Sequence, residues 1–215
     1  MLVVKQINNS PIDSNCFVIY DKAVGNDCII FDPGSDDNSR LYEFLRFEGL
    51  DPKYTILTHE HFDHCWGVNQ LRVDYPSVKL VCSTNCSVAI QERKKNYSVF
   101  YQQPGFDVDA ADIEVDMIGW QLDWNNYKLF FYSAQGHTAS GTMCVLENYI
   151  FTGDELIKGF KTVTKLKTGS KERLMDSLNL LERMKGNGLI VCSGHGETFN
   201  LDDYDLAIAN NDVKS

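Results

Sequence analysis

Between residues 58 and 64 the chain reads THEHFDH, which offers four potential metal ligands within six residues: His59, His61, Asp63 and His64. The apolar run Tyr54–Thr58 before it predicts a strand. Alternate residues of an extended backbone point the same way, so the first two histidines can reach one metal ion. The last two ligands follow where a helix would begin and turn toward a neighbouring position. The alternative, a polar loop with chance histidines, fits poorly with three of five histidines in one short stretch.

The remaining two histidines and one further aspartate stand in similar surroundings. His137 lies in SAQGHTASG, His195 in CSGHGE and Asp154 in FTGDE, and each follows a predicted strand and directly succeeds a glycine. Glycines allow tight turns that can aim an imidazole into a pocket. A single such residue is typical of a surface turn, but every histidine of the chain stands at a strand-to-loop junction. The seven side chains together predict a metal site.

The order of predicted elements is strand-rich in both halves, with helices after the strands. The predicted helices cover Asn38–Gly49, Cys65–Asp74, Asn85–Phe100, Glu172–Met184 and Asp202–Ala209. This order predicts an α/β fold in which sheet packs on sheet with helices outside, a four-layer αββα sandwich. We expect a single domain over residues 1–215, with two similar halves that meet near Val108–Asp116.

Composition excludes several classes of protein. The chain has 215 residues, a formal charge of -10 and 43% hydrophobic residues, which is typical of a globular domain. It has no apolar run of roughly 20 residues and no amino-terminal signal pattern, so we expect no membrane association. The acidic balance argues against nucleic acid as a partner. Seven cysteines, an odd number, are typical of reduced thiols and predict a cytoplasmic location.

These motifs resemble those of the metallo-β-lactamase superfamily over nearly the whole chain. The H-x-H-x-D-H motif matches residues 59–64, and the G-H-T, G-D and G-H-G motifs match Gly136–Thr138, Gly153–Asp154 and Gly194–Gly196. Residues 31–34, FDPG, resemble the early D-x-G turn of the family. The resemblance implies the αββα sandwich with a two-metal site at the edges of the sheets.

The resemblance also implies a role for each ligand. One metal would take His59, His61 and His137, the other would take Asp63, His64 and His195, and Asp154 would bridge both. Asp32 would support the first ligand cluster from behind. Nitrogen and oxygen donors suit two zinc ions as cofactors, with iron or manganese as possible substitutes.

Within the superfamily, the chain is similar to the hydroxyacylglutathione hydrolase (glyoxalase II) branch. Residues 168–178, TGSKERLMDSL, resemble its G-S-x-E-x-L run. The resemblance implies a dinuclear zinc hydrolase that uses a metal-bridging hydroxide on a small ester-like substrate, a thioester first, with Asp63 as the catalytic residue that orients the nucleophile and shuttles a proton. The alternatives are a lactonase, a phosphodiesterase or nuclease, a single-iron dioxygenase, and a non-catalytic relative. In that branch a carboxy-terminal helical domain holds glutathione, and because 20 residues follow His195 here we expect that domain to be absent.

Five lysines and no carboxylate lie between Lys158 and Lys171 in an otherwise acidic chain. A solvated loop is the simpler interpretation. The functional interpretation is that Lys158 or Lys161 binds an anionic group of a small-molecule substrate. We interpret Cys65, Cys82 and Cys86 as packing residues. The three tryptophans are expected to pack in or near the core, with a substrate pocket as the alternative: Trp66, Trp120 and Trp124.

Overall fold

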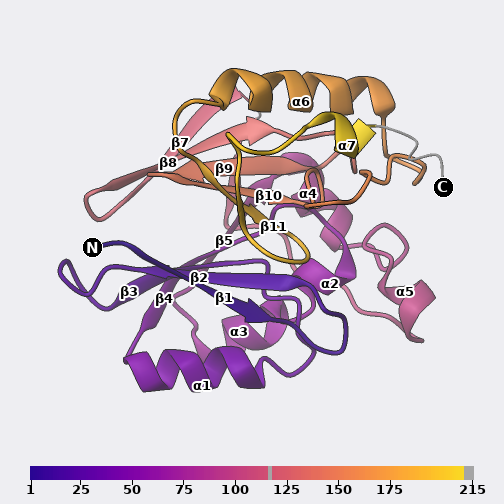
Figure 1. Cartoon of the computed structure of the whole chain (residues 1–215). Coiled ribbons are helices and arrows are strands. Elements are labelled where there is room, and N and C mark those ends of the chain that lie inside the picture. The colour runs from indigo at the N-terminus through magenta and orange to yellow at the C-terminus, as the bar shows by residue number, and fades with distance from the viewer. Residues whose placement is uncertain (116–117, 211–215) are drawn as a thin grey trace. The chain divides into compact units, whose positions relative to one another are not determined.

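The computed structural model describes residues 1–115 and 118–210. The chain forms two compact units, Met1–Val115 and Asp116–Ser215, and each contains one six-stranded sheet (Figure 1). Asp116, the end of the predicted meeting point of the two halves, lies outside the described residues. The predicted single domain stays a prediction.

The sheet of the first unit has its strands in sequence order. Its first three strands are antiparallel neighbours, and the pairs from β3 onward are parallel. The strands are β1 (Val3–Asn8), β2 (Asn15–Tyr20), β3 (Asp27–Phe31), β4 (Asp51–Ile56), β5 (Lys79–Ser83) and β6 (Ile113–Val115). Parallel neighbours require crossover connections, and helices provide them here. The crossing helices are α1 (Ser39–Glu48), α2 (Phe62–Cys65), α3 (Val68–Asp74), α4 (Thr84–Ile90) and α5 (Ser98–Tyr101).

Helix α1 covers one face of this sheet (Figure 1). Its Leu41 and Leu45, four residues apart, are buried against a cluster that includes Val18 of β2 and Ile30 of β3. The helix ends at Gly49, whose φ of 63° is the left-handed conformation that glycine adopts without strain. The predicted helix Asn38–Gly49 is therefore confirmed to within its cap residues.

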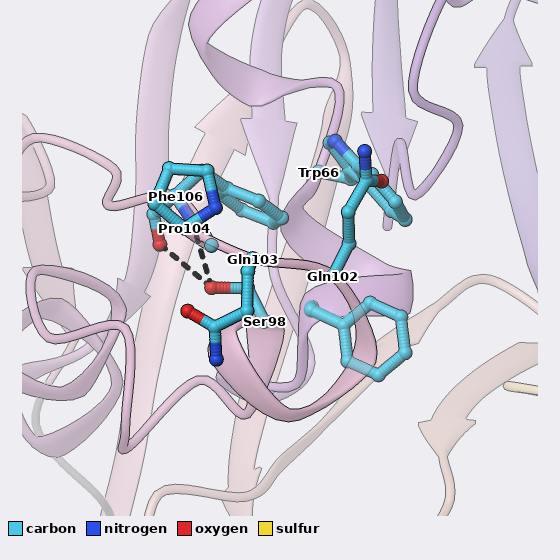
Figure 2. Close-up of a pocket in the computed structure, with 8 residues that line it drawn as sticks. Trp66, Ser98, Gln102, Gln103, Pro104 and Phe106 are labelled. Atoms are coloured by element: carbon cyan, nitrogen blue, oxygen red, sulfur yellow. Dashed lines mark hydrogen bonds between the residues drawn. The ribbon is translucent and has the colours of Figure 1, made fainter.

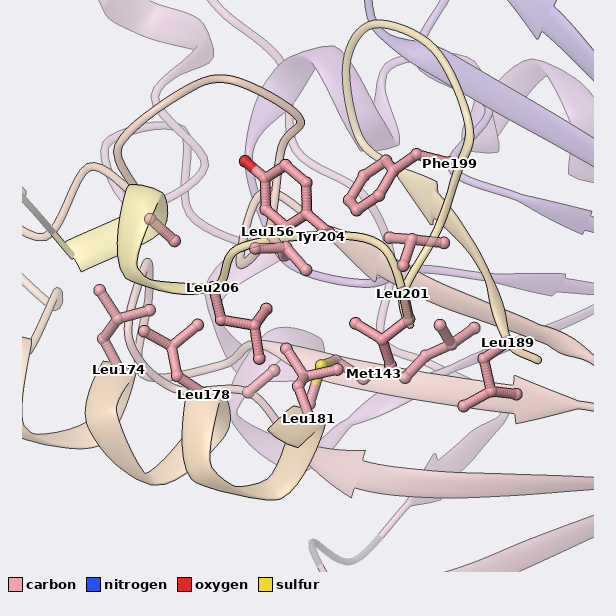
Figure 3. Close-up of a cluster of buried hydrophobic side chains, with 14 residues drawn as sticks. Met143, Leu156, Leu174, Leu178, Leu181, Leu189, Phe199, Leu201, Tyr204 and Leu206 are labelled. Atoms are coloured by element: carbon pink, nitrogen blue, oxygen red, sulfur yellow. The ribbon is translucent and has the colours of Figure 1, made fainter. Parts of the chain in front are cut away.

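The second unit has a sheet in which all neighbours are antiparallel except β10 and β11. Its strands are β7 (Ile118–Trp124), β8 (Tyr127–Ser133), β9 (Thr142–Leu146), β10 (Tyr149–Gly153), β11 (Ile190–Ser193) and β12 (Phe199–Asn200). Helix α6 (Lys171–Met184) connects the parallel pair, and α7 (Ala207–Asn210) follows the last strand. The core of this unit forms where Leu174, Leu178 and Leu181 of α6 pack on the sheet (Figure 3).

Three predicted helices differ from the observed ones, and in two of them side chains bind the backbone at the point of difference. The predicted helix Asn85–Phe100 is wrong between α4 and α5: the amide of Asn96 donates to the carbonyls of Ile90 and Phe106, and Tyr97 adopts a left-handed φ of 64°. Within the predicted helix Cys65–Asp74, Cys65 is the last residue of α2, and α3 covers Val68–Asp74.

The predicted helix Asp202–Ala209 shortens to α7. The carboxylate of Asp202 accepts hydrogen bonds from the backbone N–H groups of Gly186 and Gly188 instead of capping a helix at its own position. Among the helices of the described residues, none has the length and apolar character needed to cross a bilayer.

Candidate metal centre

The candidate ligands of the first unit are placed by the parallel pairing of β3 and β4. Phe31 pairs with Ile56 at the carboxyl ends of these strands, and the N–H of Asp32 donates to the carbonyl of Ile56. The residues that follow the two strands therefore leave the sheet at the same edge. This pairing brings Asp32 beside Thr58, directly before the first ligand.

The Asp32 carboxylate organises two of the histidines through hydrogen bonds. Its Oδ1 accepts from the N–H of Thr58 at 2.8 Å, and its Oδ2 lies 2.7 Å from the Thr58 hydroxyl and 3.1 Å from Nδ1 of His64. Because a carboxylate only accepts, the Thr58 hydroxyl and the His64 Nδ1 are the donors. The Thr58 oxygen can then accept from Nδ1 of His59, 3.0 Å away. Both imidazoles thus carry their proton on Nδ1 and their lone pair on Nε2.

The four side chains of the motif converge, as the sequence predicts. The rings of His59 and His61 have centroids 4.6 Å apart, and those of His59 and His64 are 4.3 Å apart. Nε2 of His64 lies 3.7 Å from a carboxylate oxygen of Asp63. All four residues are buried.

The backbone of Asp63 is itself fixed. Its carbonyl accepts a hydrogen bond from the Ser14 hydroxyl at 2.5 Å. Gly34 approaches so closely that a Cβ there would lie 1.6 Å from the same carbonyl oxygen. A glycine is therefore required in the turn after β3, which accounts for the FDPG sequence.

The ligands of the second unit also meet at one edge of a sheet. Strand β10 runs parallel to β11, with Gly153 paired with Ser193, so that Asp154 and His195 follow neighbouring strand ends. The N–H of Gly194 donates to the carbonyl of Gly153. The turn that carries His137 leaves β8 and returns to β9 at this same edge.

Within this second group the Asp154 carboxylate faces both histidines. One oxygen lies 3.6 Å from Nε2 of His137, and the other lies 3.6 Å from Nε2 of His195. Nδ1 of His137 lies 2.8 Å from the carbonyl of Val163. A carbonyl only accepts, so Nδ1 carries the proton and Nε2 has the lone pair on the side of Asp154.

Two positioning residues were not identified from the sequence. Thr58 is one. The other is Glu155, buried directly after Asp154, whose carboxylate accepts from the N–H groups of Gly136 at 2.9 Å and His137 at 2.8 Å. Burial raises the pKa of this carboxyl, although hydrogen bonds from Ser177, His137 and Gly136 work in the opposite direction. Nothing in the local sequence signals this contact, because it joins residues 18 and 19 positions apart.

The donor set suits a divalent metal. Both groups offer imidazole nitrogens and carboxylate oxygens on mostly buried side chains, and in three of the five histidines Nδ1 donates a hydrogen bond, which leaves the lone pair on Nε2. Cys65, close to the motif in sequence, is buried and its thiol donates to the carbonyl of Glu60. Cys65, Cys82 and Cys86 pack in one hydrophobic cluster, as predicted.

The two candidate substrate-binding lysines differ in their surroundings. Nζ of Lys158 pairs with the exposed Glu197 at 2.6 Å, and this hydrogen bond holds the pKa of the Glu197 carboxyl below its usual value. Lys161 lines a hollow of about 550 Å³ together with Lys165, Lys171 and the segment between residues 162 and 164. That segment includes Val163, whose carbonyl binds His137.

Comparison with known proteins agrees with this geometry. The chain is similar to hydroxyacylglutathione hydrolase of Buchnera aphidicola, with 24% identity over 89% of this chain and 66% of that protein. It therefore spans slightly less than two thirds of that relative. It is 26% identical to the probable metallo-hydrolase YqgX of Bacillus subtilis, over 91% of each protein.

Among solved structures, the chain resembles the BLEG-1 B3 metallo-beta-lactamase with a TM-score of 0.83, 27% identity and coverage of 93% and 94%. This similarity confirms the predicted fold class. The family model for the metallo-beta-lactamase superfamily matches residues 10–195, a range that includes all seven predicted ligands. With metal-binding His and Asp groups on such a fold, this chain belongs to the metallo-beta-lactamase superfamily.

Proposed function

We propose that the chain is a metal-dependent hydrolase of small ester-like substrates, with thioesters as the first candidates. The observation that carries the proposal is the Asp154 carboxylate, which presents one oxygen to each of two histidine Nε2 atoms at 3.6 Å. A carboxylate placed in this way could serve as a ligand to a metal held by either imidazole. Similarity to hydroxyacylglutathione hydrolases, at 24–28% identity, supports the thioester.

The ligand assignment in this proposal follows the resemblance to the family. His59, His61 and His137 would hold one zinc ion, Asp63, His64 and His195 would hold the other, and Asp154 would bridge them. Nitrogen and oxygen donors without thiolate fit zinc and also allow iron or manganese. When bound, two such ions supply a water of lowered pKa and an electrophile for the carbonyl oxygen.

The protein's own residues would position this chemistry. Asp63, held by Ser14 through its backbone carbonyl, would orient the attacking water and move its proton toward the leaving group. Asp32, through Thr58, would keep two imidazoles in the tautomer that binds metal. Lys161 would attract an anionic group of the substrate, and Lys161→Ala should raise KM for anionic substrates more than for neutral ones.

A hydrolase panel tests the reaction type. We expect metal-loaded protein to hydrolyse thioesters faster than lactones, β-lactams or bis-phosphodiesters. A net charge of -10 disfavours nucleic acid as the substrate. Activity on phosphodiesters alone, or oxygen consumption with thiol substrates, would contradict the proposal.

Asp154→Asn tests the bridging role. The variant keeps the size of the side chain but removes the charge shared by two ions, so the second metal and the hydrolysis should be lost together. Asp203→Asn, an exposed change of the same chemistry, is the matched control. If the Asp154→Asn variant still binds two metal ions per chain, Asp154 does not bridge them.

A further inference from the structure

A pocket of about 150 Å³ lies in the first unit, beside the ligand motif in sequence (Figure 2). Its walls are Phe62, Trp66, Ser98 and residues 102–106. None of these described lining residues carries a charge. In size, the pocket equals an engineered apolar cavity that binds benzene.

Aromatic rings form two sides of the pocket. The rings of Trp66 and Phe106 stack with centroids 5.4 Å apart and an interplanar angle of 23°. Phe62 meets Trp66 edge to face at 5.8 Å and stacks on Tyr101 at 4.8 Å. Flat apolar surfaces of this kind favour a ring or a short alkyl chain over a charged group.

The far side of the pocket is held in place by hydrogen bonds. The Ser98 hydroxyl lies 2.9 Å from both the N–H and the carbonyl of Phe106, and the Asn96 amide donates to the same carbonyl at 2.8 Å. Gly105 has a φ of 73°, and a Cβ there would lie 2.7 Å from the backbone nitrogen of Val99. The segment is thus built to keep one shape, and a ligand meets a largely preformed pocket.

The pocket shares a helical turn with the proposed metal ligands. Phe62 stands between His61 and Asp63, and Trp66 follows Phe62 by four residues, so the two rings project on one side of that turn. The ring of His61, the residue before Phe62, packs edge to face against the ring of Tyr97, with ring centroids 5.0 Å apart. The pocket thus includes a residue that directly adjoins two proposed ligands in sequence, which is the basis for assigning the pocket to the substrate.

From this geometry we propose that the pocket binds an uncharged apolar group on the acyl side of the substrate, about the size of a phenyl ring or a short alkyl chain. This proposal rests on the proposed ester hydrolysis and specifies the class of ester. The substrate class is then an arylalkanoyl thioester or an acyl thioester with a short alkyl chain such as hexanoyl. Trp66 and Phe106 are the specificity-determining residues.

Thioesters of one thiol with different acyl groups test the proposal. The native metal-loaded protein should show kcat/KM for hexanoyl and phenylacetyl esters at least about tenfold above the acetyl ester. In Trp66→Ala and Phe106→Ala this ratio should fall toward one. Phe47→Ala truncates an aromatic side chain that is 85% exposed elsewhere in this unit, and should keep the native ratio. A native ratio near one, or an unchanged ratio in both folded pocket variants, would overturn the proposal.

A second measurement separates this proposal from the proposed function. Phenylacetamide cannot be hydrolysed as a thioester, and it should change the fluorescence of the native protein with a Kd of about 1–10 mM. Trp66→Phe keeps an aromatic wall but should lose that signal, although two other tryptophans remain. If no thioester is hydrolysed but this signal appears and depends on Trp66, the proposed function fails and the apolar site stands. If no signal appears in the native protein, the apolar site is wrong even where thioesters are hydrolysed.

Discussion

The buried carboxylate of Asp32 determines which ring nitrogen carries the lone pair in two candidate ligands, His59 and His64. It accepts from His64 directly and from the Thr58 hydroxyl, which in turn accepts from His59. The contact depends on the pairing of β3 with β4, so it joins residues 26 and 32 positions apart. Asp32 could be predicted from the sequence because it belongs to the family motif. The contact of Thr58 with Asp32 could not, because it depends on the register of β3 and β4.

Asp32→Asn should weaken metal binding by about 10–100-fold, because the amide has only one accepting oxygen. If that oxygen stays on the Thr58 hydroxyl and Nδ1 of His64, the new NH2 group faces the N–H of Thr58, donor against donor. Competition with a chelator measures the affinity. Asp36→Asn, an exposed change four residues on, is the control. An unchanged affinity in a folded Asp32→Asn variant would show that the carboxylate does not position the ligands.

Glu155 fixes the turn of His137 in the second unit. In Glu155→Gln a single oxygen at the place of Oε2 would have to serve the N–H groups of both Gly136 and His137, while the new NH2 group would face the N–H of Gly136, which now donates to Oε1 at 2.9 Å. We expect a stability loss of about 1–3 kcal/mol together with weaker metal binding. Denaturant unfolding and chelator competition measure the two effects, with the exposed Glu182→Gln as control. If the Glu155→Gln variant is less stable but binds metal with the native affinity, Glu155 supports the fold and does not position His137 for metal binding.

At the scale of elements, the strands and ligand turns follow from local sequence, while the connections depend on tertiary contacts. Strands were predictable because apolar and β-branched residues alternate with turn residues. The residues between α4 and α5 read as helix, yet the Asn96 amide binds two carbonyls of other segments and ends the helix at Ile90. The aromatic pocket is built on this same connection, so the sequence pattern could not reveal it.

One such tertiary contact predicts a pH dependence. Burial tends to raise the pKa of Asp112, but the N–H of Leu80 and the cations Arg72 and Lys79 outweigh it and lower the pKa below its ordinary value. A carboxyl with a lowered pKa in the folded state contributes stability above its unfolded pKa, about 3.9, and loses it as the pH falls through the folded value.

Asp112→Asn should therefore cost about 0.5–1 kcal/mol at neutral pH, since the side chain is partly exposed and solvent screens the pairs. The difference from the native protein should shrink below about pH 4. Urea unfolding at pH 7 and at low pH measures it, with the exposed Asp109→Asn as control. A constant difference at both pH values would show that the ionised form is not the stabilising one.

At the scale of the whole molecule, the seven proposed ligands are divided between the two units, four in Met1–Val115 and three in Asp116–Ser215. Each unit brings its own share to the ends of its strands, and each share contains both imidazole and carboxylate. The division explains why no single stretch of sequence contains the whole ligand set. The motifs identify the ligands by resemblance, and the strand pairing explains why they stand at the sheet edges.

The metal content of the purified protein tests the central claim most directly. Elemental analysis should find about two zinc ions per chain, because the proposed ligand set would give three histidines to one ion, Asp63 with two histidines to the other, and the Asp154 carboxylate to both. One tightly held iron per chain, with oxygen consumed during turnover, would contradict the account.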